Sequence, residues 1–281
     1  MNNNFVLNRV FSQKMVKELI RDGSSALLNN GFEKYFGSST EANVNTKIQS
    51  LYSILEKSYR NEYFFKNTLL NKILLGKHSL NTTTALSEVW LNRSKADLVL
   101  LNGKAVVYEI KTELDNLDRL DQQLIDYYKV FGNVEIVTDE SHLDRINNKY
   151  LNTSVGILLL TNRKTISVVK KSNLDLSNLE YLSMYKLLRK EEKINILTYF
   201  YDILPAVDQF SEYDVYFNLF NKIPLPDLYL RMLKELKMRD KKIVDNSSYF
   251  VKSPFELRSL LYFNPLKIDE YIKLEKIIEE T

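Results

Sequence analysis

The sequence lacks cysteine altogether and has only two histidines, so few of its side chains are of the types that bind soft metals. The missing thiols exclude disulfides and thiolate metal sites, and two imidazoles are few for a zinc site. The remaining ligands are mainly the carboxylates of Asp and Glu. A metal held by this chain would therefore be a hard ion such as Mg²⁺ or Mn²⁺, bound through oxygen.

Long apolar runs are missing too, because no stretch reaches the ~20 residues that a membrane-spanning helix needs. The opening residues, MNNNFVLNRV, show no basic patch followed by an apolar segment, which is the pattern of a secretory signal. We therefore expect a cytoplasmic protein with no membrane partner. The net charge of +3 is too small to indicate nucleic-acid binding by itself.

The composition that remains is that of a globular protein, with 44% hydrophobic and 27% charged residues. Helical periodicity predicts helices over 46–60, 62–75 and 114–131. Short runs of Val, Ile, Leu and aromatic residues predict strands at 88–92, 97–101, 104–111, 134–138, 155–161 and 165–170. We expect an α/β fold in the order helix, three strands, helix, strand, followed by a further hairpin.

Three regions follow from this pattern. Residues 1–60 form an N-terminal helical region, 61–171 the α/β core, and 172–281 a C-terminal helical region. The second boundary lies in the polar, turn-rich segment SNLDLSNLE, residues 172–180.

The segment VVYEIKTELDNLDRL, residues 106–120, places charges inside an apolar strand. Glu109 and Lys111 share one face of that strand, because side chains alternate with period two. Asp97 opens the preceding strand in the same way. Since buried charges are costly unless paired or coordinated, three of them in one hairpin indicate a site.

Two carboxylates and a lysine suit metal-assisted hydrolysis of phosphodiesters. Asp97 and Glu109 would bind the metal, and Lys111 would orient the attacking water or neutralise charge on the phosphate. A cross-strand ion pair is the structural alternative.

These residues, in this order of elements, resemble the PD-(D/E)XK nuclease superfamily over roughly residues 62–140. The EIKTELD segment is similar to that of an uncharacterised bacterial branch, whereas Ala96 stands where the superfamily has its name-giving proline. The resemblance implies a restriction-endonuclease-like core and a Mg²⁺- or Mn²⁺-dependent nuclease. The resemblance favours DNA over RNA as the substrate, and a biological role in defence, repair or mobile-element biology. A nuclease that cuts both strands often needs two active sites, which would favour a homodimer. The alternative to a nuclease is a non-catalytic module that binds nucleic acid or protein.

The hairpin turn decides whether Asp97 can reach this site. A two-residue Asn102–Gly103 turn would put Leu101 opposite Lys104 and send Asp97 to the face away from Glu109. A three-residue loop with Gly103 in the left-handed conformation would put Leu100 opposite Lys104 and return Asp97 to that face. The nuclease hypothesis therefore requires that loop or a bulge near Asp97.

Superfamily members often carry a further acid on the first helix or first strand. Glu62 is the first candidate for a metal ligand because it opens the predicted helix at 62–75, and Glu88 is the second. The structural alternatives are an acid that interacts with the helix dipole for Glu62 and a solvated strand start for Glu88. Arg93 and Lys95 would either contact phosphate or be surface residues.

The helix after the site repeats polar residues every four positions, at Arg119, Gln123 and Tyr127. Gln123 and Tyr127 match the QxxxY pattern of RecB-like members, which implies support of the site or contact with nucleic acid. A polar helix face is the alternative. Further along, the run RMLKELKMRDKK is a solvated face or a phosphate-binding surface; its cations are Arg231, Lys234, Lys237, Arg239, Lys241 and Lys242.

Overall fold

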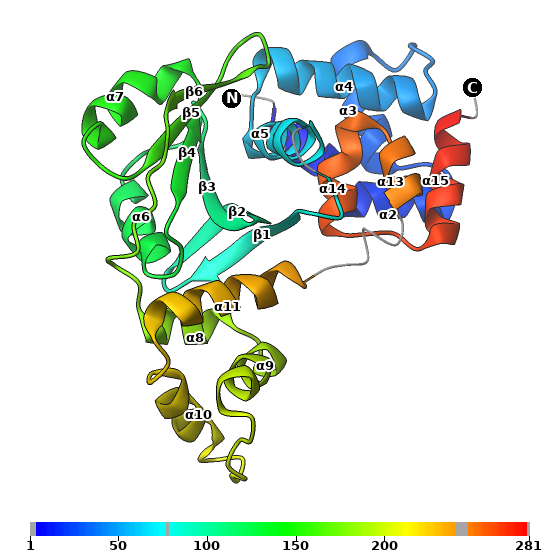
Figure 1. The fold of residues 1–281 in the computed structure, drawn as a ribbon. Coiled ribbons are helices and arrows are strands. Elements are labelled where there is room, and N and C mark those ends of the chain that lie inside the picture. The colour runs from blue at the N-terminus through cyan, green and yellow to red at the C-terminus, as the bar shows by residue number, and fades with distance from the viewer. Residues whose placement is uncertain (1–3, 77–78, 240–246, 280–281) are drawn as a thin grey trace. The chain divides into compact units, whose positions relative to one another are not determined.

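A computed structural model of the chain describes residues 4–76, 79–239 and 247–279. Its contacts group the chain into two units. Figure 1 colours the chain by residue number, from blue at the N-terminus to red at the C-terminus. The first comprises Met1–Leu80, Thr112–Leu114 and Lys241–Thr281, and the second Asn81–Lys111 and Asp115–Asp240. The predicted division at 1–60, 61–171 and 172–281 stays a prediction.

The first unit is helical. From the N-terminal part of the chain it contains α1 (Phe5–Val10), α2 (Gln13–Asp22), α3 (Ala26–Phe36), α4 (Val44–Ser58), α5 (Glu62–Leu69) and the π-helix η1 (Leu70–Leu75). From the C-terminal part it contains α13 (Ser247–Lys252), the 3₁₀ helix η2 (Phe255–Leu257), α14 (Arg258–Phe263) and α15 (Ile268–Glu279). The helix predicted at 62–75 thus changes from α to π geometry at Leu70.

Side-chain caps begin α2, α3, α4 and α5, and one buried amide joins the N-terminal and C-terminal parts of this unit. Asn61, for example, accepts the N–H of Phe64 and starts α5. The fully buried Asn67 donates to the carbonyl of Phe255 at 3.0 Å and accepts from the N–H of Ser259 at 2.9 Å. These bonds tie α5 to residues nearly two hundred positions later.

The second unit is built on a six-stranded mixed sheet in the order β1-β2-β3-β4-β5-β6. Its strands are β1 (Thr84–Leu91), β2 (Ser94–Asn102), β3 (Lys104–Lys111), β4 (Val134–Thr138), β5 (Gly156–Leu160) and β6 (Ile166–Lys170). The pairs β1–β2, β2–β3 and β5–β6 are antiparallel, whereas β3–β4 and β4–β5 are parallel. The predicted α/β class is confirmed, and β3 and β4 have the predicted bounds.

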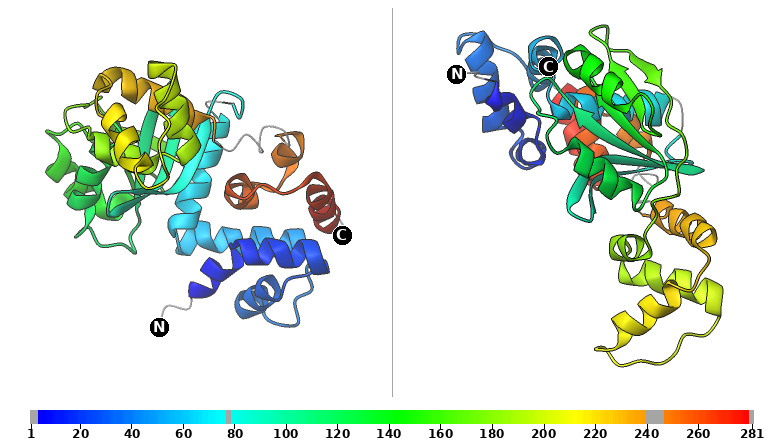
Figure 2. Two further views of the ribbon diagram at one scale, coloured as in Figure 1. Left: turned by 90° about the horizontal axis from the view of Figure 1, so that it is seen from below. Right: turned by 90° about the vertical axis from the view of Figure 1, so that its left-hand side faces the viewer.

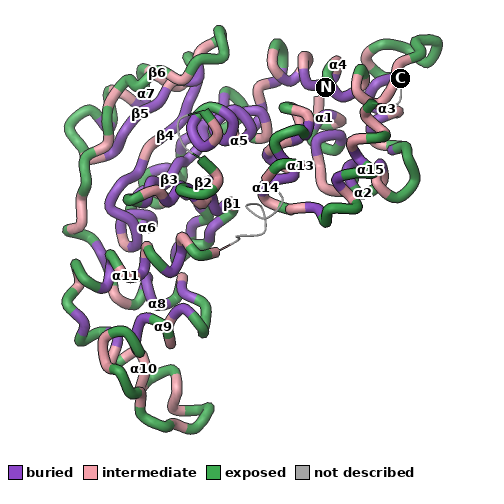
Figure 3. Tube along the Cα trace, turned by 45° about the vertical axis from the view of Figure 1, so that its right-hand side comes forward, coloured by how far each residue is buried: buried purple, intermediate pink, exposed green. Residues whose placement is uncertain are grey.

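Helices complete the second unit, and those nearest the sheet cover it. They are α6 (Leu120–Tyr128), α7 (Glu140–Tyr150), α8 (Tyr181–Leu187), α9 (Lys190–Tyr201), α10 (Glu212–Phe220) and α11 (Leu225–Lys237). Helix α6 packs on β2 and β4, α7 on β4 and β5, α8 on β1, and α11 on β2. Helix α9 packs on α11, and α10 on α8 and α9. Figure 2 shows α8–α11 grouped together, and Figure 3 shows that β2, β3 and α6 are largely buried.

Two helix predictions are corrected here. The helix predicted at 114–131 begins only at Leu120, because the residues before it form a loop. Helix α7 was not predicted, although two parallel neighbours such as β4 and β5 need a crossover connection. No helix among the described residues is long and apolar enough to cross a membrane.

Candidate active site

The β2–β3 hairpin has a register that neither predicted turn provides. Leu101 pairs with Ala105 and Asn102 with Lys104, so both predicted registers are wrong. The left-handed conformation expected of Gly103 is confirmed, with φ of 69°. The observed register fixes which residues of the two strands lie side by side.

The pairing of β2 with β3 ends at Leu98 and Tyr108, one residue before Asp97. One further step in the same register would bring Asp97 opposite Glu109. There the Asp97 side chain takes the place of a backbone partner, because its Oδ2 accepts the N–H of Ile110 at 2.7 Å. Asp97 therefore lies where β2 and β3 separate.

The neighbouring strand β1 is irregular at the same level. Glu88 has φ of 55°, a left-handed value that is rare for a residue other than glycine. Its neighbours keep their regular pairing with β2, so Glu88 lies opposite Asp97. Leu86 and Val89, on either side, face one core although they are three residues apart, which regular alternation would not allow. Such a break redirects side chains.

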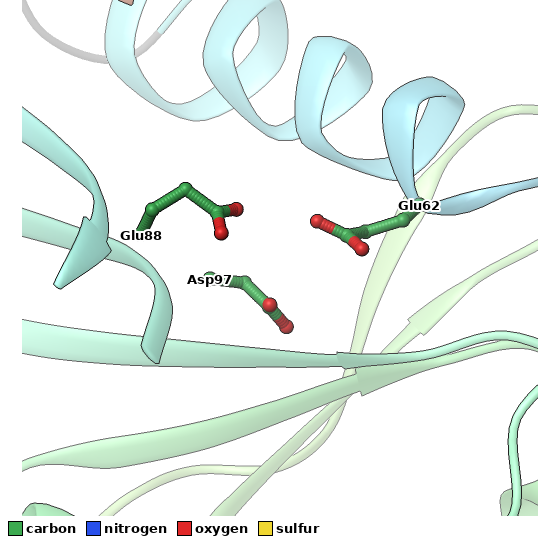
Figure 4. A group of neighbouring side chains, drawn as sticks. All are labelled: Glu62, Glu88 and Asp97. Atoms are coloured by element: carbon green, nitrogen blue, oxygen red, sulfur yellow. The ribbon is translucent and has the colours of Figure 1, made fainter. Parts of the chain in front are cut away.

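The two irregular positions bring two carboxylates together within the second unit. Ligand oxygens of Glu88 and Asp97 lie within 4.8 Å of each other. Figure 4 shows both side chains, together with Glu62 of the first unit. The ammonium of Lys95 forms an ion pair with Glu88. Two carboxylates this close repel each other, and a nearby cation relieves that repulsion.

On β3, Glu109 is buried, with 1% of its surface exposed, and is surrounded by hydrogen-bond donors. Its Oε1 accepts from Lys111 Nζ at 2.6 Å and from Gln123 Nε2 at 2.6 Å. Its Oε2 accepts from the hydroxyl of Tyr127 at 2.6 Å. Lys111 also donates to Gln123 Oε1 at 3.0 Å. Four residues predicted from the sequence thus form one buried network.

The Tyr127 hydroxyl has two acceptors within reach and only one proton to donate. Besides Glu109, the carbonyl oxygen of Lys95 lies 3.0 Å away. Both contacts are satisfied at once if Glu109 carries a proton, donates it to Tyr127, and Tyr127 donates to Lys95. The hydrogen-bond geometry therefore accommodates either protonation state of Glu109.

The electrostatics of the network agree with that geometry. Burial raises the pKa of Glu109, although the charge of Lys111 and the hydrogen bonds from Lys111, Tyr127 and Gln123 oppose the shift. Burial also raises the pKa of Tyr127, and the negative charges of Glu109 and Asp97 add to it. The Tyr127 hydroxyl is thus within the field of both carboxylates.

Two other predicted residues lie outside this network. Glu62 opens α5 in the first unit and pairs with Lys66 at 2.9 Å; its role as a metal ligand stays a prediction. Arg119 is exposed at the N-cap of α6, where its carbonyl accepts the N–H of Gln123. Of the predicted stripe, Gln123 and Tyr127 reach the buried network.

A buried acid that the sequence pattern did not single out is Asp126, with 3% of its surface exposed. It accepts from Ser94 Oγ at 2.7 Å and from Gln122 Nε2 at 3.3 Å, and so holds the start of β2 against α6. The sequence does offer a signal for Asp126, because it is a charged residue among the apolar residues of the predicted helix, between Leu124 and Tyr127.

The basic run of the C-terminal half is partly used for folding. Arg231 pairs with Glu235 at 2.6 Å, and Arg239 makes two bonds of 2.5 Å to Glu192. Lys241 and Lys242 lie outside the described residues. Two of the cations predicted as a phosphate-binding surface therefore already have carboxylate partners.

Comparison with known proteins identifies one family whose sequence model matches the chain. The sequence model of the family described as bacteriophage P4 protein cII matches residues 56–255, well over half of the chain. No curated protein matches. Among solved structures, the SPO1766 protein of unknown function from Silicibacter pomeroyi is 14% identical and covers 46% of this chain and 87% of its own. Its TM-score of 0.28 is too low for an argument about the fold.

Proposed function

The chain belongs to the bacteriophage P4 protein cII family, and we propose that it is a metal-dependent nuclease that hydrolyses phosphodiester bonds. DNA is the favoured substrate, on the resemblance to PD-(D/E)XK nucleases. The family takes its name from a phage protein, which agrees with a role in mobile-element biology or in defence.

The observation that carries this proposal is the buried network around Glu109. Lys111, Gln123 and Tyr127 all contact one carboxylate that burial leaves poorly solvated. Perturbed acids that lie beside a lysine and a second carboxylate are typical of catalytic sites. In the expected superfamily arrangement, these residue types occupy the third strand and the following helix.

The order of elements supports the same proposal. Helix α5 precedes the antiparallel strands β1, β2 and β3, and α6 then leads to β4, which is parallel to β3. This is the helix, three strands, helix, strand order that the resemblance implies. Asp97 lies on β2, and the Glu109–Lys111 pair lies on β3.

The residues present fit a hard divalent cation. Asp97 and Glu88 offer carboxylate oxygens within 4.8 Å of each other, the ligand type that Mg²⁺ and Mn²⁺ prefer. The carboxylate of Glu109 is desolvated, so a nearby cation would stabilise its charged form. Geometry therefore supports Asp97 and Glu88 as ligands, whereas Glu109, which is not part of that group, is proposed as a ligand on the resemblance.

A bound ion would supply an activated water and would neutralise charge on the phosphate. The rest falls to the chain itself. Two of the three donors of the Lys111 ammonium go to Glu109 and Gln123, so a third could bind a water or a phosphate oxygen. Gln123 and Tyr127 keep the Glu109 carboxylate in place.

The test is cleavage of labelled single-stranded DNA, duplex DNA and RNA by the purified chain, with Mg²⁺, with Mn²⁺ and with a chelator. We expect cleavage only with metal. Asp97→Asn and Lys111→Met should lower the rate by on the order of a hundredfold or more. Asp121→Asn is the matched control, because Asp121 is on α6 but bonds to Lys149 and Tyr150 instead.

Equal rates for the wild type and for Asp97→Asn would remove the catalytic assignment. Thermal melting of each variant separates a lost active site from a lost fold. A rate that falls for Asp121→Asn as much as for Asp97→Asn would point to a general loss of folding.

The second candidate is a module that keeps this fold without catalysis. Its support is that both oxygens of Glu109 already have donors, as in a structural ion-pair network. Binding of nucleic acid that is independent of metal, with no cleavage under any condition, would favour this function.

A further inference from the structure

The chain has one tryptophan, Trp90, and it is exposed. About 66% of its surface is open, although it lies within strand β1. Its neighbours Val89 and Leu91 are buried in the core of the second unit. The alternation of a strand therefore turns the indole away from that core. A large aromatic surface held in this way is available to a ligand.

A cation accompanies the indole on the neighbouring strand. Trp90 pairs with Lys95 of β2, and the Lys95 ammonium lies 5.9 Å from the ring centroid. Arg93, in the turn between the strands, is exposed. An aromatic ring interleaved with cations is how proteins bind an unpaired nucleic-acid strand, since bases stack on rings and cations contact phosphates.

This surface continues into the candidate active site. Lys95 pairs with Glu88, which lies opposite Asp97. Trp90 is two residues from Glu88, a distance of about 7 Å along the strand. A nucleotide stacked on Trp90 would therefore place the neighbouring phosphate near the Glu88 and Asp97 carboxylates.

From this geometry we propose that Trp90 is a stacking platform for an unpaired base, with Lys95 contacting the adjacent phosphate. The substrate class is then a single-stranded segment, because the bases of an intact duplex keep their faces covered by their neighbours. The assignment to cleavage rests on the nuclease function proposed above, whereas the binding itself does not.

The single tryptophan makes this binding directly measurable. Trp90 fluorescence is followed while a short oligothymidine, or a blunt duplex of the same length, is added in the presence of a chelator. We expect quenching by the single strand and much weaker quenching by the duplex. Labelled-oligonucleotide anisotropy gives the affinity independently.

Variants separate stacking from charge. Trp90→Leu should weaken binding of the single strand by about 5- to 100-fold, and Trp90→Phe should retain much of the affinity. Lys95→Gln should lower the slope of log affinity against log salt by about 0.7. Phe210→Ala is the control, because Phe210 is 96% exposed and lies in a different part of the second unit.

Saturation of the protein by oligothymidine without a change in Trp90 fluorescence would overturn the inference, as would equal affinity for Trp90→Leu. Tighter binding of the duplex would overturn the choice of substrate. Because binding is measured without metal, quenching in a protein that never cleaves would sink the nuclease function and leave the stacking platform intact. If Trp90→Leu left both cleavage and binding unchanged, the stacking platform would be wrong and the nuclease function would stand.

Discussion

Two buried ion pairs in the second unit can be compared directly, Glu109–Lys111 on β3 and Glu192–Arg239 between α9 and the end of α11. The side chains of both pairs are at most 10% exposed. Each carboxylate also receives hydrogen bonds from groups other than its cation. By burial and bonding alone, both would be assigned to the fold.

Their acid–base properties are opposite. Burial raises the pKa of Glu109 despite its partners. Burial acts in the same direction on Glu192, but the hydrogen bonds from Arg239 and from the N–H of Arg189 outweigh it, so the pKa of Glu192 is lowered. A guanidinium that bonds both carboxylate oxygens compensates burial, whereas one ammonium at a strand does not. The uncompensated pair is the one we assign to function.

The largest expected effect is on the compensated pair. Arg239→Met should lower the free energy of unfolding by about 3–5 kcal/mol, because Glu192 is left buried without its cation. Denaturant unfolding measures this. Lys190→Met is the control, since Lys190 and Glu212 form an exposed pair, and it should cost less than about 1 kcal/mol. A loss for Arg239→Met as small as the control's would show that the pair is not structural.

Removing the cation of the other pair should cost less. We expect Lys111→Met to lower the free energy of unfolding by about 2–3 kcal/mol at neutral pH, since Glu109 can take up a proton instead of remaining an unpaired charge. Denaturant unfolding at neutral and at acidic pH measures the loss. The cost should shrink as the pH falls, and a cost that grows on acidification would contradict the raised pKa of Glu109.

The pH dependence should differ in sign between the two carboxylates. The pKa of Glu109 is raised, so its contribution to stability is full below the ordinary value of 4.5 and is lost as the pH rises. The pKa of Glu192 is lowered, so its contribution is present above 4.5 and is lost as the pH falls. A tenfold difference in proton affinity between the folded and unfolded chain corresponds to about 1.4 kcal/mol of stability.

Melting curves from acidic to neutral pH test this contrast. Relative to the wild type, the Glu109→Gln/Lys111→Met double variant should become more stable as the pH rises. Glu192→Gln should become less stable relative to the wild type over the same range. If the stability of both variants changed with pH in parallel with that of the wild type, the predicted acid–base contrast between the two pairs would be wrong.

The smallest expected effect concerns a single hydroxyl. Tyr127→Phe removes one donor from Glu109 and should lower the free energy of unfolding by about 1–2 kcal/mol. Tyr150→Phe is the matched control, because Tyr150 bonds to the exposed Asp121. Denaturant unfolding should show a smaller loss for Tyr150→Phe, and an equal loss would mean that the site around Glu109 is not unusually desolvated.

The sequence predicted the parts of this site that depend on local pattern. Strands β3 and β4 follow directly from apolar runs, and the four-residue spacing of Gln123 and Tyr127 put both on one helix face. These features need only the period of a strand or a helix. That this face lies toward Glu109 was implied by the resemblance and not by the spacing.

What the sequence did not predict depends on long-range packing. The hairpin register was wrong because it is decided by which apolar residues reach the core. The observed register is one step from that of the two-residue turn, which reverses every side chain, and two steps from that of the three-residue loop, which reverses none. The left-handed Glu88 has no local signal of the glycine type. Helix α7 was missed because it buries only Ile146 and Tyr150 along eleven residues, too few for a clear apolar stripe.

The bonds of Asn67 to Phe255 and Ser259 also have a consequence for the order of folding. During synthesis, all residues of the second unit, which ends at Asp240, are joined to the chain before helices α13–α15 are made. The first unit cannot complete its folding until these helices are present, because it is joined by contacts of very large sequence separation, which form slowly. Until then, α5 exposes the surface that those helices will cover. The nascent chain is therefore expected to carry a folded sheet while its first helices still await their partners.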